Sequence, residues 1–298
     1  MPTPQPLLDP EAMQRIARLD LLARQVVEGT LAGLHRSIFH GFSIEFLQHR
    51  PYVPGDDLRY LDWKVLGRTD RHYVRQFEDE TNLRATILLD ASGSMGYRSG
   101  TVSKLDYAVR FAASLAYLLV EQQDSVGLVV FDESHRVSLP SRSGRRQLKA
   151  IFDELERTTA GGETSLAKVI HGLVPRIPRR GLVLVLTDAF DDVDALLNSL
   201  VRLRNEHHEV ILFQILDRRE VDFDFGRWTR FDSLESDEDK ILADPAQVRR
   251  MYLERFESFQ RTLREGCHRH RVDVVPGVTD VRYDEALASF LANRGARE

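Results

Sequence analysis

An aspartate and two serines stand at alternate positions where one apolar run of the sequence stops. The stretch reads LLDASGSM: Asp90 closes the run, and Ser92 and Ser94 follow it. A turning loop with this spacing aims alternate side chains at one centre, and Gly93 and Gly96 allow tight backbone there. One carboxylate and two hydroxyls form an all-oxygen set, which hard divalent cations prefer.

Two further segments carry oxygen ligands of the same kind. The glycine-rich loop TTAGGETS contains Thr164, and the apolar run GLVLVLTD ends in Asp188, as another run ends in Asp132. Ligands of open α/β sheets bind beyond the carboxyl ends of the strands, where Asp90 and Asp188 would converge if their strands are neighbours. We therefore predict a Mg²⁺ site, with Mn²⁺ or Ca²⁺ as alternatives, formed by Asp90, Ser92, Ser94, Thr164 and Asp188.

This ligand set leaves one coordination position of the ion open to a ligand from another molecule. Neutral hydroxyls compensate the charge of a divalent ion only in part, and five side chains leave one coordination position for a carboxylate from outside. The plainer interpretation makes Ser92 and Ser94 turn residues and helix caps, for which serine is also suited.

The elements that must position these residues alternate along the chain. Strand-length apolar runs without polar alternation are typical of strands buried on both faces. Between them, apolar residues recur at helical spacing. A mainly parallel sheet with helices on both faces is the expected α/β fold. The expected strands are 83–90, 125–132, 181–188, 209–217 and 271–277, and the expected helices are 11–28, 104–121, 145–157, 166–177, 192–206, 245–270 and 283–294, with a short run at 135–140.

Composition shifts divide the chain into two predicted domains. Residues 1–80 hold the first helix and a region of strands and loops, and residues 81–298 form the α/β domain, with an insertion at about 218–243. Short aromatic runs occur in both 30–80 and 218–243, which suggests that the two segments together make a small β-rich appendage.

Charge and composition narrow the class of protein. A net charge of −5 gives no global reason to expect nucleic acid or an anionic membrane as partner. The first residues lack the pattern of a secretory signal, and no apolar run reaches the roughly 18–20 residues of a membrane helix. The single cysteine, Cys267, has no partner for an internal disulfide. These features predict a cytoplasmic protein without membrane insertion.

The sequence lacks the residues that several enzymatic mechanisms require. A haloacid dehalogenase-type phosphotransferase needs an acid/base aspartate two residues after its nucleophile, where this chain has Ser92. The flanks are not those of a nucleophilic serine, and no Walker motif is present. We expect Cys267 to be a buried structural residue. Histidines at predicted helix ends could bind zinc but are expected to be solvated: His207, His208, His268 and His270.

A family resemblance rests on three motifs. The motifs DASGSM, GGETSL and LTDA resemble the metal-ion-dependent adhesion site of von Willebrand factor A domains. The resemblance implies a Rossmann-like sheet with strand order 3-2-1-4-5-6. It also implies that the serine and threonine hydroxyls bind the ion directly, whereas the aspartates often act through water. Ala189 departs from the pattern, because many members carry glycine there.

The preceding segment narrows the resemblance. Residues 33–80, with motifs such as P-G-D-D and R-x-x-D-W-K, look like the domain of unknown function 58 family, and the likeness extends over nearly the whole chain. Members of this family resemble partners of MoxR-type AAA+ ATPases, with which they are thought to act as metal-dependent chaperones or activation factors.

The segment PGDDLRYLDWK has two interpretations. It is either a salt-bridged structural loop, in which Arg59 forks onto a carboxylate, or a docking surface for the ATPase. The docking residues would be Asp56, Asp57, Arg59, Asp62 and Trp63.

Three functions fit these observations. The first, which we favour, is a non-enzymatic interaction module whose Mg²⁺ binds an aspartate or glutamate of a partner, with no nucleic acid or small-molecule substrate. The second is a Mg²⁺-dependent phosphoester hydrolase. The third is a structural protein whose metal merely rigidifies the sheet. In the first, the final helix, 283–294, would shift when the site is ligated.

Overall fold

The structure is a computed structural model that describes residues 44–53, 61–69, 71–79, 83–132, 135–162, 166–174, 177, 180–225, 229–232, 240–243 and 245–295. The described residues fall into two compact units, the smaller within Leu31–Asn82 and the larger from Leu83 onward. The helix predicted over 11–28 lies outside the described residues.

The smaller unit contains a β-hairpin with a helical turn in its connection. Strands β1 (Ile44–Pro51) and β2 (Tyr73–Asp79) pair antiparallel, and α3 (Trp63–Thr69) lies between them in sequence. The Asp62 side chain caps α3, because its Oδ1 accepts hydrogen bonds from the backbone N–H groups of Lys64 and Val65, at 2.9 and 3.1 Å. The described residues of this unit contain strands and one short helix.

The larger unit is built on a six-stranded sheet with the order β10-β7-β6-β3-β4-β5. If the six strands are numbered 1 to 6 in chain order and read from the β5 edge, the order is 3-2-1-4-5-6. This is the strand order that the family resemblance implies, so that expectation is confirmed. All pairs are parallel except β4 with the edge strand β5. The strands are β3 (Arg84–Asp90), β4 (Ser125–Phe131), β5 (His135–Arg142), β6 (Leu182–Thr187), β7 (Glu209–Leu216) and β10 (Asp273–Val278).

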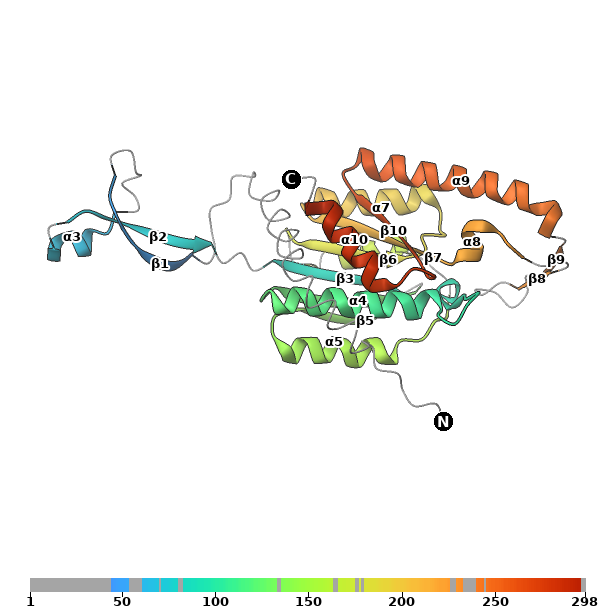
Figure 1. The fold of residues 1–298 in the computed structure, drawn as a ribbon, viewed down its shortest axis with the longest axis horizontal. Helices are drawn as coiled ribbons and strands as arrows, with labels where there is room; N and C mark the ends of the chain where they lie inside the picture. The colour runs from blue at the N-terminus through green and yellow to red at the C-terminus, as the bar shows by residue number, and fades with distance from the viewer. Residues whose placement is uncertain are drawn as a thin grey trace. The chain divides into compact units, whose positions relative to one another are not determined.

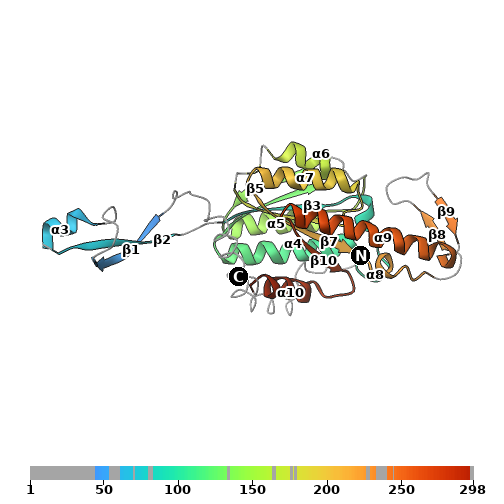
Figure 2. The same ribbon diagram turned by 90° about the horizontal axis from the view of Figure 1, so that it is seen from above.

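Helices cover both faces of this sheet. Helices α4, α5 and α10 lie on one face, and α6, α7 and α9 on the other (Figures 1 and 2). Their bounds are α4 (Lys104–Glu121), α5 (Arg145–Arg157), α6 (Leu166–Leu173), α7 (Val193–Asn205), α9 (Pro245–Arg269) and α10 (Tyr283–Gly295). The predicted α/β fold is therefore confirmed, and the four central strands β3, β4, β6 and β7 are buried on both faces.

The two layers of the core are of different composition. On one face, aliphatic residues of β6, α6, α7 and α9 pack together, and Cys267 is buried among them as predicted. On the other face, aromatic rings from three elements meet: Phe213 of β7 lies 4.8 Å from Phe111 of α4 and 5.1 Å from Phe290 of α10, measured between ring centroids.

Two expectations about the elements are wrong. Helix α6 ends at Leu173, not at Ile177, because Pro175 disfavours helical backbone in the residue before it. The described residues of 218–243 form α8 (Arg218–Asp222) and a hairpin of β8 (Thr229–Asp232) and β9 (Lys240–Ala243). This hairpin is a sheet separate from β1–β2 and belongs to the other unit, so the two segments do not make one appendage.

None of the helices in the described part of the chain combines the length and the apolar character needed to cross a membrane.

Candidate metal site

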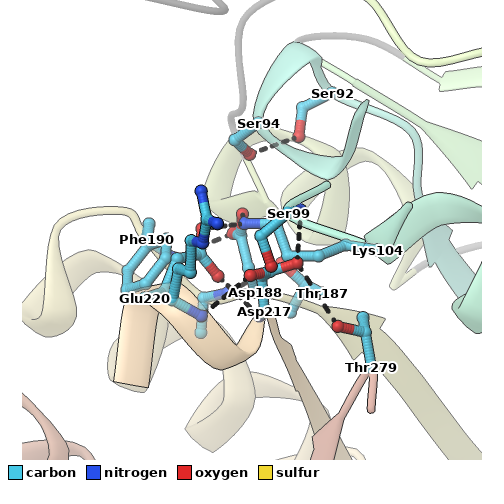
Figure 3. A network of polar contacts seen from close by, with 12 residues as sticks. Ser92, Ser94, Ser99, Lys104, Thr187, Asp188, Phe190, Asp217, Glu220 and Thr279 are labelled. Atoms are coloured by element: carbon cyan, nitrogen blue, oxygen red, sulfur yellow. Dashed lines mark hydrogen bonds and ion pairs between the residues drawn. The ribbon is translucent and has the colours of Figure 1, made fainter. Parts of the chain in front are cut away.

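The loop after β3 presents the first group of predicted ligands. Asp90 is fully buried at the end of the strand, and its Oδ1 accepts a hydrogen bond from the Ser92 N–H at 2.9 Å. The chain then enters the short helix η2 (Gly93–Gly96), which brings Ser92 Oγ and Ser94 Oγ within 3.2 Å of each other (Figure 3). Ligands about 2.1 Å from an octahedral Mg²⁺ are about 3.0 Å apart when adjacent. The two hydroxyls therefore fit neighbouring coordination positions.

Hydrogen bonds join this loop to the other two motifs. Because β3 and β6 are neighbours, Thr187 Oγ1 reaches Asp90 Oδ2 and donates to it at 2.6 Å. The Gly93 N–H donates to the Gly162 carbonyl at 2.8 Å, and the Gly161 N–H donates to the Ala91 carbonyl at 3.0 Å. The three segments thus converge at the carboxyl edge of the sheet. Thr164 itself lies outside the described residues.

A third strand-end carboxylate shapes the glycine loop. Asp132 Oδ2 binds Arg136 Nε at 2.7 Å, and the same guanidinium donates to the carbonyls of Thr159 and Gly161, both at 2.6 Å. Gly162 has φ +77°, and a Cβ there would lie 2.9 Å from Asp132 Oδ2. Glycine is needed at this position for both reasons.

The carboxylate of Asp188 is paired with a buried cation that the sequence analysis missed. Asp188 and Lys104 are both fully buried, and Lys104 Nζ lies 2.8 Å from Asp188 Oδ2 (Figure 3). Asp188 Oδ1 accepts the Phe190 N–H at 3.1 Å. Lys104 Nζ also lies 2.6 Å from Glu220 Oε1, so it bridges the end of β6 and α8.

The electrostatics of these groups favour a cation between the carboxylates. Burial and the negative charge of Asp188 raise the pKa of Asp90 to about 7, although hydrogen bonds from Thr187 and Ser92 oppose the rise. Burial alone would lower the pKa of Lys104, but the charges of Asp188 and Glu220 raise it above its ordinary value. Lys104 therefore remains an ammonium ion, and within the described part of the chain it is Asp188, not Asp90, that this ammonium pairs with.

A fourth strand-end carboxylate, Asp217, was also overlooked, although the run EVILFQILD ends in it. Its Oδ2 accepts the Ser99 N–H at 2.9 Å and the Thr279 hydroxyl at 3.4 Å, which ties the first loop to the end of β10. The Asp217 N–H donates to Glu220 Oε2 at 2.8 Å. Burial would raise the pKa of Asp217, but the hydrogen bonds from Ser99 lower it.

The residue that departs from the family pattern adopts the backbone that glycine favours. Ala189 has φ +62° and is buried, and the turn that it makes leaves Phe190 with 36% of its surface exposed.

The remaining sequence predictions have mixed outcomes. Asp62 caps α3 and Trp63 is 63% exposed, whereas Asp56, Asp57 and Arg59 lie outside the described residues. The expectation of a solvated His208 is wrong: it is fully buried, and its Nδ1 accepts the Gly181 N–H at 3.2 Å. Across the described ranges, no three histidine, cysteine, aspartate or glutamate side chains gather closely enough to hold a metal.

The strand order, the helices on both faces and the polar loops at the carboxyl edge define an α/β domain of the von Willebrand factor A type. The family model described as "Protein of unknown function DUF58" matches residues 48–265, and the chain therefore belongs to the DUF58 family.

The chain also resembles individual proteins at lower identity. The chain is 28% identical to "Uncharacterized protein Rv1480" of Mycobacterium tuberculosis and to "Uncharacterized protein Mb1516" of Mycobacterium bovis, over 72% of this chain and 68% of each relative. Among solved structures, BatB from Bacteroides thetaiotaomicron aligns with a TM-score of 0.47 at 15% identity, over 72% of this chain and all of that one. The SpRpn10 VWA domain aligns with a TM-score of 0.42 at 10% identity, over 69% of this chain and 94% of that one.

Proposed function

We propose that this protein is a non-enzymatic interaction module that binds Mg²⁺ at the carboxyl edge of its sheet and, through the ion, a carboxylate of a partner protein. A von Willebrand factor A-type fold in a DUF58 member is consistent with a protein-interaction module. The observation that carries the proposal is the convergence of the loops after β3 and β6 with the glycine loop, joined by the Thr187–Asp90 and Gly93–Gly162 hydrogen bonds.

The residues have distinct roles in this proposal. Ser92 and Ser94, with Thr164, would bind the ion directly through their hydroxyls, and Asp90 and Asp188 would hold it through their charge. The bound ion would supply a Lewis acid with a position open to a carboxylate; Mn²⁺ or Ca²⁺ would suit the same oxygen ligands. Thr187 holds the Asp90 carboxylate in place, because its hydroxyl donates to Oδ2.

The proposed partner is a MoxR-type AAA+ ATPase, with which the chain would act on a client protein as a chaperone or activation factor. This role follows from the resemblance of the family. The exposed Trp63 supports a second contact with the ATPase through the smaller unit, together with Asp56, Asp57, Arg59 and Asp62.

Titration of Mg²⁺ into the purified chain by calorimetry tests the site. We expect Ser94→Ala to weaken binding at least about tenfold, which corresponds to about 1.4 kcal/mol for a lost ligand. The matched control is Ser258→Ala, which removes an exposed hydroxyl on α9. Equal affinities of the wild type and Ser94→Ala would contradict the site.

Capture of the purified ATPase tests the function. Because the ATPase needs Mg²⁺ for its own nucleotide, the comparison uses variants in constant Mg²⁺ and ATP rather than a chelator. We expect the wild type and Ser258→Ala to retain the ATPase and Ser94→Ala to lose it. Undiminished capture by Ser94→Ala would mean that the ion does not mediate the contact.

The hydrolase alternative makes a different prediction. It requires Mg²⁺-dependent release of nitrophenol from p-nitrophenyl phosphate by the wild type, lost in Asp90→Ala. We expect no turnover from either protein. Turnover by the wild type alone would overturn the assignment of a non-enzymatic role.

A further inference from the structure

Lys104 occupies a position that is electrostatically costly for a lysine. It is fully buried and begins α4, where the positive end of the helix dipole disfavours a cation. Burial removes the ammonium from water, which is costly unless carboxylates compensate it. The Ser103 capping box holds this first turn of α4, since Ser103 and Asp106 exchange hydrogen bonds. The capping box therefore fixes the position of the Lys104 backbone at the start of α4.

Two carboxylates from different elements compensate the ammonium. Lys104 Nζ lies 2.8 Å from Asp188 Oδ2 and 2.6 Å from Glu220 Oε1, and the face of the Phe190 ring lies 5.0 Å away. The second oxygen of Glu220 accepts the Asp217 N–H, which closes the first turn of α8. Figure 3 shows Lys104, Asp188 and Glu220 in one network of polar contacts. The ammonium is thus shared between the candidate metal site and α8.

This arrangement places a permanent positive charge against a carboxylate that a divalent ion would also use. Charges interact strongly at short range in a buried site, so Lys104 opposes a second cation near Asp188. Glu220 acts in the opposite sense, because its charge draws the ammonium toward α8 and neutralises it.

We propose, on the basis of the function proposed above, that Lys104 is a built-in counter-cation that competes with the divalent ion for Asp188, and that Glu220 sets the strength of this competition. Both are positioning residues that do not bind the ion. Lys104 compensates Asp188 in the metal-free protein, so the loops are assembled before the ion arrives. When the ion binds, it replaces the ammonium as the partner of Asp188, and the ammonium remains paired with Glu220. Because Glu220 belongs to α8, occupancy of the metal site is linked to this helix.

Opposite effects of two substitutions on Mg²⁺ affinity test this proposal. Lys104→Met removes the competing charge while keeping much of the side-chain volume, and we expect Mg²⁺ to bind about tenfold more tightly. Glu220→Gln keeps the shape and the capping hydrogen bond but leaves Asp188 as the one carboxylate of this pair that compensates the ammonium, and we expect Mg²⁺ to bind about tenfold more weakly. A purely structural role would weaken binding in both variants.

The controls carry the same changes of charge away from the site. Lys149→Met removes the cation of an exposed pair on α5, and Glu254→Gln removes the anion of an exposed pair on α9. Both should bind Mg²⁺ like the wild type. If Lys104→Met does not fold without metal, the double variant Lys104→Met/Glu220→Gln replaces it, and it should bind more tightly than Glu220→Gln alone.

The outcomes separate this inference from the proposed function. If the wild type binds Mg²⁺ and Lys104→Met does not bind it more tightly, the competition is wrong and the metal site stands. If only Lys104→Met binds Mg²⁺, the lysine has taken the place of the ion, which supports the competition and contradicts the proposed function. If no variant binds Mg²⁺, both ideas are wrong.

Discussion

At the scale of single residues, burial shifts the pKa of a carboxyl group that lies away from the candidate metal site. Asp124 lies at the start of β4, at the opposite end of this strand from Asp132. It is 2% exposed, and its Oδ1 accepts the Leu83 N–H at 2.9 Å. Burial raises its pKa from 3.8 to about 7, although this hydrogen bond opposes the rise. The fold therefore favours the protonated form of Asp124.

This shift predicts how stability depends on pH. Because the folded state holds the proton of Asp124 more tightly than the unfolded chain does, the free energy of unfolding should fall as pH rises from about 4 to about 7, with the loss complete above that range. Asp124→Asn keeps an oxygen acceptor for Leu83 and should flatten this dependence. Urea unfolding across pH in a chelating buffer measures it.

The control for this prediction is Asp153→Asn, which changes an exposed carboxylate on α5. It should follow the wild type at every pH. Asp90, whose pKa is raised in the same direction, contributes a slope that Asp124→Asn leaves in place. An unchanged slope in Asp124→Asn would show that this carboxyl group is ionised in the fold.

At the scale of elements, the edge strand β5 depends on a glycine in its neighbour. A Cβ at Gly127 of β4 would lie 2.8 Å from the Leu139 carbonyl and the Ser141 hydroxyl of β5. The register of the two strands also shifts between Val126 and Leu128. Glycine at this position therefore lets the backbones approach where the strands are irregular.

Alanine scanning of two glycines tests this packing. Gly127→Ala should lower the free energy of unfolding by about 1–3 kcal/mol, because β5 must move away from β4. Gly172→Ala is the contrast, since that glycine lies in α6 with no atom within 4 Å of the added methyl group. It should raise the stability by about 0.5–1 kcal/mol. Equal effects in chemical denaturation would contradict the steric argument.

At the scale of the whole molecule, the proposed function assigns one contact with the ATPase to each of the two units. Trp63 of the smaller unit is 63% exposed on α3, and α3 is anchored by the Asp62 cap. An exposed tryptophan contributes little to folding, whereas tryptophan is frequent among the residues that dominate binding energy in interfaces. A substitution at Trp63 can therefore test the proposed contact with the ATPase without changing the stability of the fold.

Trp63→Ala should leave the thermal unfolding of the chain unchanged and reduce capture of the ATPase at least about tenfold. Met251→Ala is the control, because it removes an exposed apolar side chain from α9 of the larger unit. Undiminished capture by Trp63→Ala would remove the docking role of the smaller unit and leave the metal site as the only proposed contact.

The sequence by itself determined most strands and helices of the larger unit and which loops carry the candidate oxygen ligands. Those features depend on local periodicity: α4 and α5 have the predicted bounds, and Asp90, Ser92 and Ser94 share one short loop. It did not reveal that Lys104 is paired with Asp188, which is 84 residues away, or with Glu220, which is 116 residues away. It also did not reveal that His208 is buried. Only the tertiary structure decided these contacts, because the order of strands in the sheet sets which loop ends become neighbours and which polar groups lose their water.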